Sequence, residues 1–205
     1  MNIGFFALSL ALAATTGPSP AWLDARVPAN WNVSGAAIAA APPWRVDGRI
    51  VKGGKDPELL AGGRCASTVR PAAGSADRAV AGRGWLVARV VPALPSAMNA
   101  GGWTVVMGIS GADGMCRPVG YQLFAFHGGA FVGTLSPQRM DSRTDGSFVA
   151  LRPSGPNTLQ VDFVRYADQD PLCCPHATTR VSYAIANGVG AVVKPIASRT
   201  MPNSG

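Results

Sequence analysis

Charged side chains and histidine are scarce in this sequence. Asp, Glu, Lys and Arg together make up 14% of its 205 residues, and it has 2 His. A disordered chain carries more charge than this, and the 47% of hydrophobic residues are enough to close a core. Long helices are also disfavoured, because 25 Gly and 17 Pro interrupt the chain. The sequence therefore predicts a globular domain built from short elements.

Clusters of basic residues are absent as well. The 18 Lys and Arg outnumber the 11 Asp and Glu and give a net charge of +7, but they are spread singly from Arg26 to Arg199. Nucleic-acid-binding proteins gather such residues on one face that follows the phosphates. We therefore expect no nucleic-acid partner, and the positive charge suits an anionic surface instead.

The first part of the chain lacks charged side chains. None occurs from Met1 to Trp22, and an apolar run extends from Ile3 to Ala14. This run is shorter than the roughly 20 residues that a bilayer-spanning helix needs, and small residues follow at the spacing of signal-peptidase sites. We expect a signal peptide at residues 1–21. An irregular lead-in rich in Ala, Gly and Pro is expected at 22–63, and a single β-rich domain at 64–205.

Four cysteines follow the predicted leader: Cys65, Cys116, Cys173 and Cys174. None lies near the predicted cleavage site, so anchoring through an acylated cysteine is not expected. An even number in an exported protein indicates two disulfides. Adjacent residues have Cα atoms about 3.8 Å apart, below the roughly 4.4–6.8 Å usual for disulfides. We therefore expect Cys65 and Cys116 each to pair with one of the adjacent cysteines, in an order left open. Adjacent cysteines also lack zinc-ligand spacing, so no metal site is expected.

Strands dominate the predicted domain. Runs of β-branched and aromatic residues, separated by short turns, indicate antiparallel hairpins without crossover helices. In one run, Leu159, Val161 and Phe163 alternate with polar residues, which predicts one buried face. The predicted strands are Trp85–Val91, Trp103–Ile109, Gly120–Phe126, Ala130–Leu135, Phe148–Arg152, Thr158–Tyr166, Arg180–Ile185 and Gly190–Pro195.

A single short helix is predicted at Ser75–Ala81, with Ser75 as its N-cap. The turns between strands have suitable residues, and Asn187-Gly188 is the dipeptide favoured in tight hairpins. The fold class is therefore mainly β (β-rich α+β): an antiparallel sheet of hairpins with one short helix, braced by disulfides.

Few residues have the spacing of a catalytic or ligand site. The segment Gly108–Ala112 has Ala where a nucleophile elbow needs its second Gly. Asp141, Arg143 and Asp145 resemble half of a calcium loop, but Arg143 occupies a ligand position, so a hydrogen-bonded turn is the preferred interpretation. We predict no catalytic residue and no cofactor.

An anionic ligand is the best small-molecule hypothesis. Arg117, Arg139 and Arg143 could converge with His127 on such a ligand. The five Trp residues are interpreted as packing residues, because they lack the basic residues that accompany base-stacking platforms.

Three segments together resemble a known family. They are MCRPVGYQLFAFHGGAFVGTLSP (115–137), DSRTDG (141–146) and RYADQDPLCCPHATTRVSYAI (165–185). In combination they resemble the LppP/LprE family of bacterial cell-envelope proteins, over roughly residues 103–186. The resemblance implies a secreted or periplasmic module of the cell envelope, with no catalytic residues to transfer. The chain differs from the lipoprotein members in lacking the acylated cysteine.

Two functions are carried forward from the sequence. The first is a secreted, non-catalytic cell-envelope module that binds an envelope component or protein. The alternative is a secreted hydrolase that uses His127 or Asp145 in acid-base chemistry. An enzyme needs a pocket where at least two titratable side chains converge, whereas a binding module needs only a suitable face.

Overall fold

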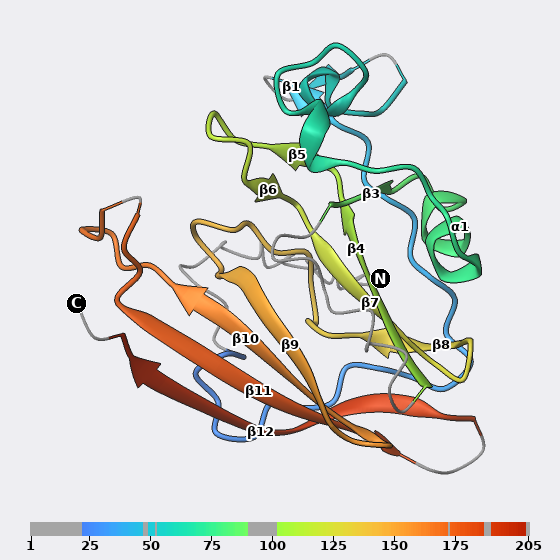
Figure 1. The fold of residues 1–205 in the computed structure, drawn as a ribbon, viewed down its shortest axis with the longest axis vertical. Helices are drawn as coiled ribbons and strands as arrows, with labels where there is room; N and C mark the ends of the chain where they lie inside the picture. Colours follow the sequence, from blue (N-terminus) through green and yellow to red (C-terminus); the bar gives the residue numbers. More distant parts are fainter. Residues whose placement is uncertain are drawn as a thin grey trace, which may run out of the picture.

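Two four-stranded antiparallel sheets form the centre of the molecule (Figure 1). The computed structural model describes residues 22–46, 49–51, 53–89, 102–171, 173–186 and 190–203. The first sheet has the order β3-β4-β7-β8, with β3 at Leu86–Val87, β4 at Trp103–Ile109, β7 at Gln122–His127 and β8 at Ala130–Thr134. The second sheet has the order β12-β11-β10-β9, with β9 at Ser147–Gly155, β10 at Thr158–Arg165, β11 at Ala177–Ala186 and β12 at Val192–Pro202.

The smaller elements lie around these sheets. They are two short ribbons, β1 (Arg45–Val46) with β2 (Arg49–Ile50) and β5 (Gly111–Ala112) with β6 (Pro118–Val119), the 3-10 helices η1 (Pro57–Leu59) and η2 (Ala66–Thr68), and the helix α1 (Ser75–Ala81). The predicted fold class is confirmed, because the sheets are antiparallel and α1 is the one α-helix of the described residues. No helix in these residues is both long and apolar enough to cross a bilayer.

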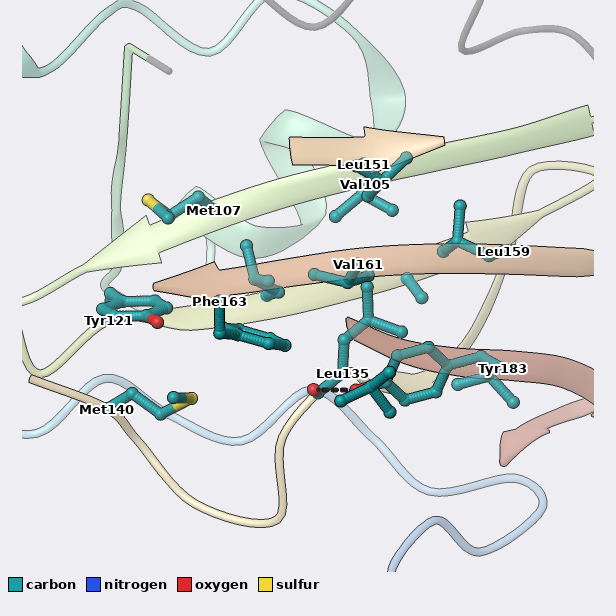
Figure 2. Packing of buried hydrophobic residues seen from close by; sticks show 14 of the residues in the cluster. Val105, Met107, Tyr121, Leu135, Met140, Leu151, Leu159, Val161, Phe163 and Tyr183 are labelled. Carbon is teal, nitrogen blue, oxygen red and sulfur yellow. Dashed lines mark hydrogen bonds between the residues drawn. The ribbon is translucent and has the colours of Figure 1, made fainter. Parts of the chain in front are cut away.

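The main core lies between the two sheets. Leu159, Val161 and Phe163 of β10 are fully buried, which confirms the face predicted from their alternation. They pack in one cluster with residues of β4 such as Val105 and Met107 (Figure 2). The buried Tyr183 of β11 donates its hydroxyl to the Leu135 carbonyl at 2.6 Å, so its polar end is satisfied.

A second, smaller core covers the opposite face of the first sheet. Val106 and Phe124 point to this side and pack with Val80 of α1 and with Trp85. The first sheet is thus buried on both faces, and α1 lies on its outer side (Figure 1). The first sheet lies between α1 and the second sheet. A sheet covered on both faces needs apolar side chains on both, and β4 and β7 are accordingly almost continuously apolar.

The helix has the predicted bounds but not the predicted cap. Gly74 is the N-cap, and Ser75 is the first helical residue, with no side-chain capping bond. Asp77 stabilises the first turn instead, because its carboxylate accepts the Ala73 N–H at 3.0 Å and pairs with the Arg70 guanidinium. Ser75 therefore does not cap the helix, and the Asp77 carboxylate instead fixes the chain just before the N-cap.

The predicted lead-in has little regular structure, but it packs on the core. Leu23 is 1% exposed and belongs to the main cluster. The Asn32 amide donates to the carbonyls of Thr134 and Val193, both at 2.9 Å, and its oxygen accepts the Thr134 N–H at 2.8 Å. Because Thr134 ends β8 and Val193 lies in β12, this one side chain connects the two sheets.

The disulfide pairing differs from the prediction. Cys65 bonds to Cys116, with Cα atoms 5.2 Å apart, and Cys173 bonds to its neighbour Cys174. The expectation that each of the adjacent cysteines pairs with Cys65 or Cys116 is wrong. The fold separates the two sets: Cys65 is buried beside the turn between β5 and β6 that carries Cys116, whereas Cys173 and Cys174 are exposed in the loop between β10 and β11.

Candidate functional site

The four predicted ligand residues do not converge. Arg117 lies just before β6, beyond one end of β4, whereas His127 pairs with Trp103 at the opposite end of that strand. The His127 ring packs edge-on against Trp103, with ring centroids 5.0 Å apart, and its Nε2 lies 3.0 Å from the Pro156 carbonyl. His127 therefore joins two hairpin turns, and the structure does not bring it to the arginines.

Arg143 is held by the loop that contains the adjacent cysteines. Its guanidinium stacks over the Tyr166 ring at 4.5 Å and donates to the Asp170 carbonyl at 2.8 Å. Asp170 also lies 2.8 Å from Nδ1 of His176. Hydrogen bonds to the Asp170 carboxylate, first from the Ala167 N–H and then from His176, lower its pKa. The fold thus supplies His176 with a carboxylate that its immediate sequence neighbours lack.

Arg139 lines an open polar cavity of about 670 Å³. One wall comes from the lead-in, through Pro43 and Trp44, and the facing wall comes from Arg139, Asp141 and Asp145. Arg139 is exposed, and no partner for its side chain is found in the described part of the chain. Ser110, the centre of the near-miss nucleophile elbow, also lines the cavity, but its hydroxyl donates to the Gly120 carbonyl at 3.1 Å.

Trp44 owes its position to a glycine. Its ring packs directly on Gly111 of β5, where an added Cβ would come within 2.2 Å of the ring. The indole N–H is buried without a hydrogen-bond partner in the described residues. Such an unpartnered donor is uncommon in a protein interior, and here it belongs to a residue that lines a cavity.

The two aspartates of the cavity shape the loop after β8. The Asp145 carboxylate accepts the Asp141 N–H at 2.8 Å, and the Asp141 carboxylate accepts the Gly120 N–H at 2.5 Å. Burial raises the pKa of Asp145, and the neighbouring Asp141 charge raises it further, against the hydrogen bond from the Asp141 N–H. The predicted hydrogen-bonded turn is therefore present, although Arg143 points to Asp170 instead of joining it.

A separate cleft of about 270 Å³ lies beside Arg117. It is bounded by both sheets, through Met107 of β4 and Phe148 of β9, and by the disulfide at Cys116. Arg117 donates from Nε to the Asp113 carboxylate at 2.6 Å. Partial burial opposes ionisation of Asp113, but hydrogen bonds from Arg117 and Met115 outweigh it and hold its pKa below the usual value.

Metal chemistry has no ready-made ligand set in these ranges. No group of three or more His, Cys, Asp and Glu side chains in the described residues could hold an ion. The arrangement instead offers two recesses of different character, one polar and open, the other partly apolar and set between the sheets.

The site residue that sequence reasoning missed is Trp44. It follows Pro42-Pro43 in a stretch with no periodicity, so nothing in its spacing indicates that it faces the loop at 138–145. Trp44 is one of three Trp residues in a lead-in otherwise rich in small residues, and a large aromatic side chain in such a stretch is the signal that could have suggested a packed or ligand-facing position.

The antiparallel two-sheet fold, the two recesses and the disulfides define a small disulfide-braced β module. Residues 99–188 match the family model described as LppP/LprE lipoprotein, which confirms the predicted resemblance. The match indicates a protein of the bacterial cell envelope. It covers both sheets apart from β3 and β12, and it includes the 138–145 wall of the polar cavity but not Trp44. Comparison with curated proteins gave no match, and comparison with solved structures gave none either.

Proposed function

We propose that the protein is a secreted, non-catalytic module of the bacterial cell envelope that binds an envelope polysaccharide in the polar cavity. The observation that carries the proposal is the meeting of Trp44 with Arg139, Asp141 and Asp145 around about 670 Å³. This volume is in the range of small-ligand sites. An aromatic ring can cover the apolar face of a sugar, while carboxylates accept and a guanidinium donates hydrogen bonds to its hydroxyls.

The charge of the cavity supports a polyhydroxylated ligand over a highly charged one. Arg45 and Arg139 each contribute a positive charge to the lining, and Asp141 and Asp145 each contribute an acidic group. Opposed charges of this kind do not select a strong anion or cation, but they provide many hydrogen-bonding atoms. Arg139, Asp141 and Asp145 all lie in the segment that matches the envelope family, whereas Arg45 does not.

The test is binding of the purified protein to immobilised polysaccharide from bacterial envelopes. We expect retention that Arg139→Gln weakens about tenfold, which corresponds to loss of about 1.4 kcal/mol. Arg139 is exposed, so the variant should fold normally. Arg199→Gln is the matched control, because Arg199 is an exposed arginine on β12 that does not line the cavity. No retention of the wild type, or equal loss in both variants, contradicts the proposal.

The hydrolase alternative has one observation in its favour, the raised pKa of Asp145 in the cavity. A carboxyl group with a raised pKa stays protonated up to a higher pH, so it can act as a general acid. One of the two carboxylate oxygens of Asp145 is, however, engaged with the Asp141 N–H, and His127 lies at the other end of β4. If Asp145 were the acid, Asp145→Asn would lower a hydrolysis rate by about 10²–10⁴-fold. The binding proposal expects no polysaccharide cleavage by the wild type.

A further inference from the structure

The cleft between the sheets combines an apolar lining with arginine. Its apolar residues include Met107, Phe148 and Pro118, and Thr68 adds a hydroxyl. Arg117 and Arg89 both line it. The cleft is distinct from the polar cavity, since the two share no lining residue.

Arg117 has hydrogen-bonding capacity that the protein does not use. Its Nε is bonded to Asp113, but its Nη1 atom is buried and has no partner in the described residues. An unsatisfied buried donor costs about 1–3 kcal/mol, more for a charged group. A ligand oxyanion at this point would remove that cost and gain a charge-assisted hydrogen bond.

Arg89 adds a second positive charge on the same cleft. It is exposed, and the hydrogen bond assigned to its side chain runs from Nε to the Ser67 carbonyl at 3.2 Å. Among the described residues that line the cleft, none carries a carboxylate. Asp113 balances Arg117 from outside the lining, so Arg89 leaves the cleft with an excess of positive charge.

We propose that this cleft binds a small amphiphile that carries one oxyanion, with the oxyanion on Arg117 and Arg89 and an acyl or alkyl chain against Met107 and Phe148. The volume of about 270 Å³ corresponds to about nine water molecules at about 30 Å³ each. It therefore fits a short chain and excludes full burial of a long one. The oxyanion can be a carboxylate or a phosphate monoester, since a guanidinium binds either.

Calorimetric titration of the purified protein tests this assignment. The probes are decanoate, decyl phosphate and the neutral alcohol decanol. We expect saturable binding of at least one of the two anions, and at least tenfold weaker binding of decanol. Binding of decanoate alone assigns the site to carboxylates, and binding of decyl phosphate alone assigns it to phosphate monoesters. Absence of binding by both anions, or equal binding of decanol, overturns the proposal.

Variants separate Arg117 from general surface charge. Arg117→Gln should weaken binding of the anion at least tenfold, whereas Arg64→Gln should leave it unchanged, because Arg64 is exposed, pairs with Glu58 and does not line the cleft. Trp44→Phe, in the polar cavity, should also leave it unchanged. Unchanged binding by a folded Arg117→Gln protein contradicts the proposal.

A readout on the wild type covers the case in which Arg117→Gln does not fold. With methionine methyl groups labelled for NMR, the anion should shift the Met107 signal, because Met107 lines the cleft. The Met140 signal should not move, since Met140 is fully buried and is not part of the lining. Equal shifts of both signals, or no shift of Met107 at saturation, would refute binding between the sheets.

Discussion

The two disulfides should contribute very differently to stability. Cys65 and Cys116 are 51 residues apart, so their bond closes a long loop in the unfolded chain. In the chain-entropy treatment, a loop of that size is worth about 4 kcal/mol. Cys173 and Cys174 are already adjacent, and their bond restricts almost no additional chain. Replacing the first pair with Ala should therefore lower the unfolding free energy by about 4 kcal/mol, while the second replacement should change it little.

Thermal unfolding of the two double variants measures this difference. For a protein of this size, about 4 kcal/mol corresponds to a Tm lower by about 8–16 °C. Cys173→Ala with Cys174→Ala serves as the matched control, since it also removes one bond and two sulfurs. Peptide mapping of the non-reduced protein checks the connectivity directly. Equal losses of Tm in the two variants, or peptides that join Cys65 or Cys116 to Cys173 or Cys174, would refute the reasoning.

Three further predictions concern stability and binding. Asp162 is 5% exposed, and its carboxylate accepts hydrogen bonds from Arg180 at 2.7 Å and Arg152 at 2.6 Å. Burial opposes ionisation of Asp162, but these bonds lower its pKa in the folded protein. Its contribution to stability is therefore present above the unfolded pKa near 3.8 and is lost as the pH falls through the lower folded pKa. Acid titration of unfolding should show this loss in the wild type and not in Asp162→Asn, which itself should cost about 1–3 kcal/mol at neutral pH; parallel acid curves would contradict the role. Asn32→Ala removes three hydrogen bonds that tie the lead-in to both sheets and should cost about 2 kcal/mol in denaturant unfolding. Asn30→Ala, whose bonds lie inside the lead-in, should cost under about 0.5 kcal/mol. His127→Ala and His176→Ala should leave polysaccharide retention unchanged, because neither His lines the polar cavity or the cleft between the sheets; loss of retention at unchanged Tm would revive an acid-base role.

Most strands could be predicted because their patterns are local. The bounds of β4 agree with the prediction, and β7, β8 and β10 differ by one or two residues, since dense apolar runs between Gly-containing turns are sufficient to define them. β9, β11 and β12 extend further than predicted, because their outer positions carry polar residues that pairing still accommodates. Of the predicted strand Trp85–Val91, only Leu86–Val87 is strand, and its last two residues lie outside the described residues, as does Asn187-Gly188.

The site was harder to predict because it depends on contacts between distant segments. No local pattern brings Trp44 to Asp145, or Arg117 to Phe148, since these proximities arise only when the ribbons and sheets pack. The predicted cysteine pairing was wrong for the same reason. It rested on the short Cα distance between adjacent cysteines, whereas the fold places Cys65 and Cys116 side by side. Arg117 and Arg139 were predicted to converge on one anion, but the fold places them in different recesses.

The contacts between the lead-in and the last strand affect the timing of folding. The carbonyl groups of Leu23 and Arg26 accept hydrogen bonds from Ser198 of β12, so the lead-in pairs with the last strand. Contacts of such sequence separation form late and slow folding. The core around Leu23 therefore cannot close until nearly the whole polypeptide is available. In a nascent chain, the contacts of Leu23 and Arg26 with β12 would therefore form only after Ser198 has been synthesised.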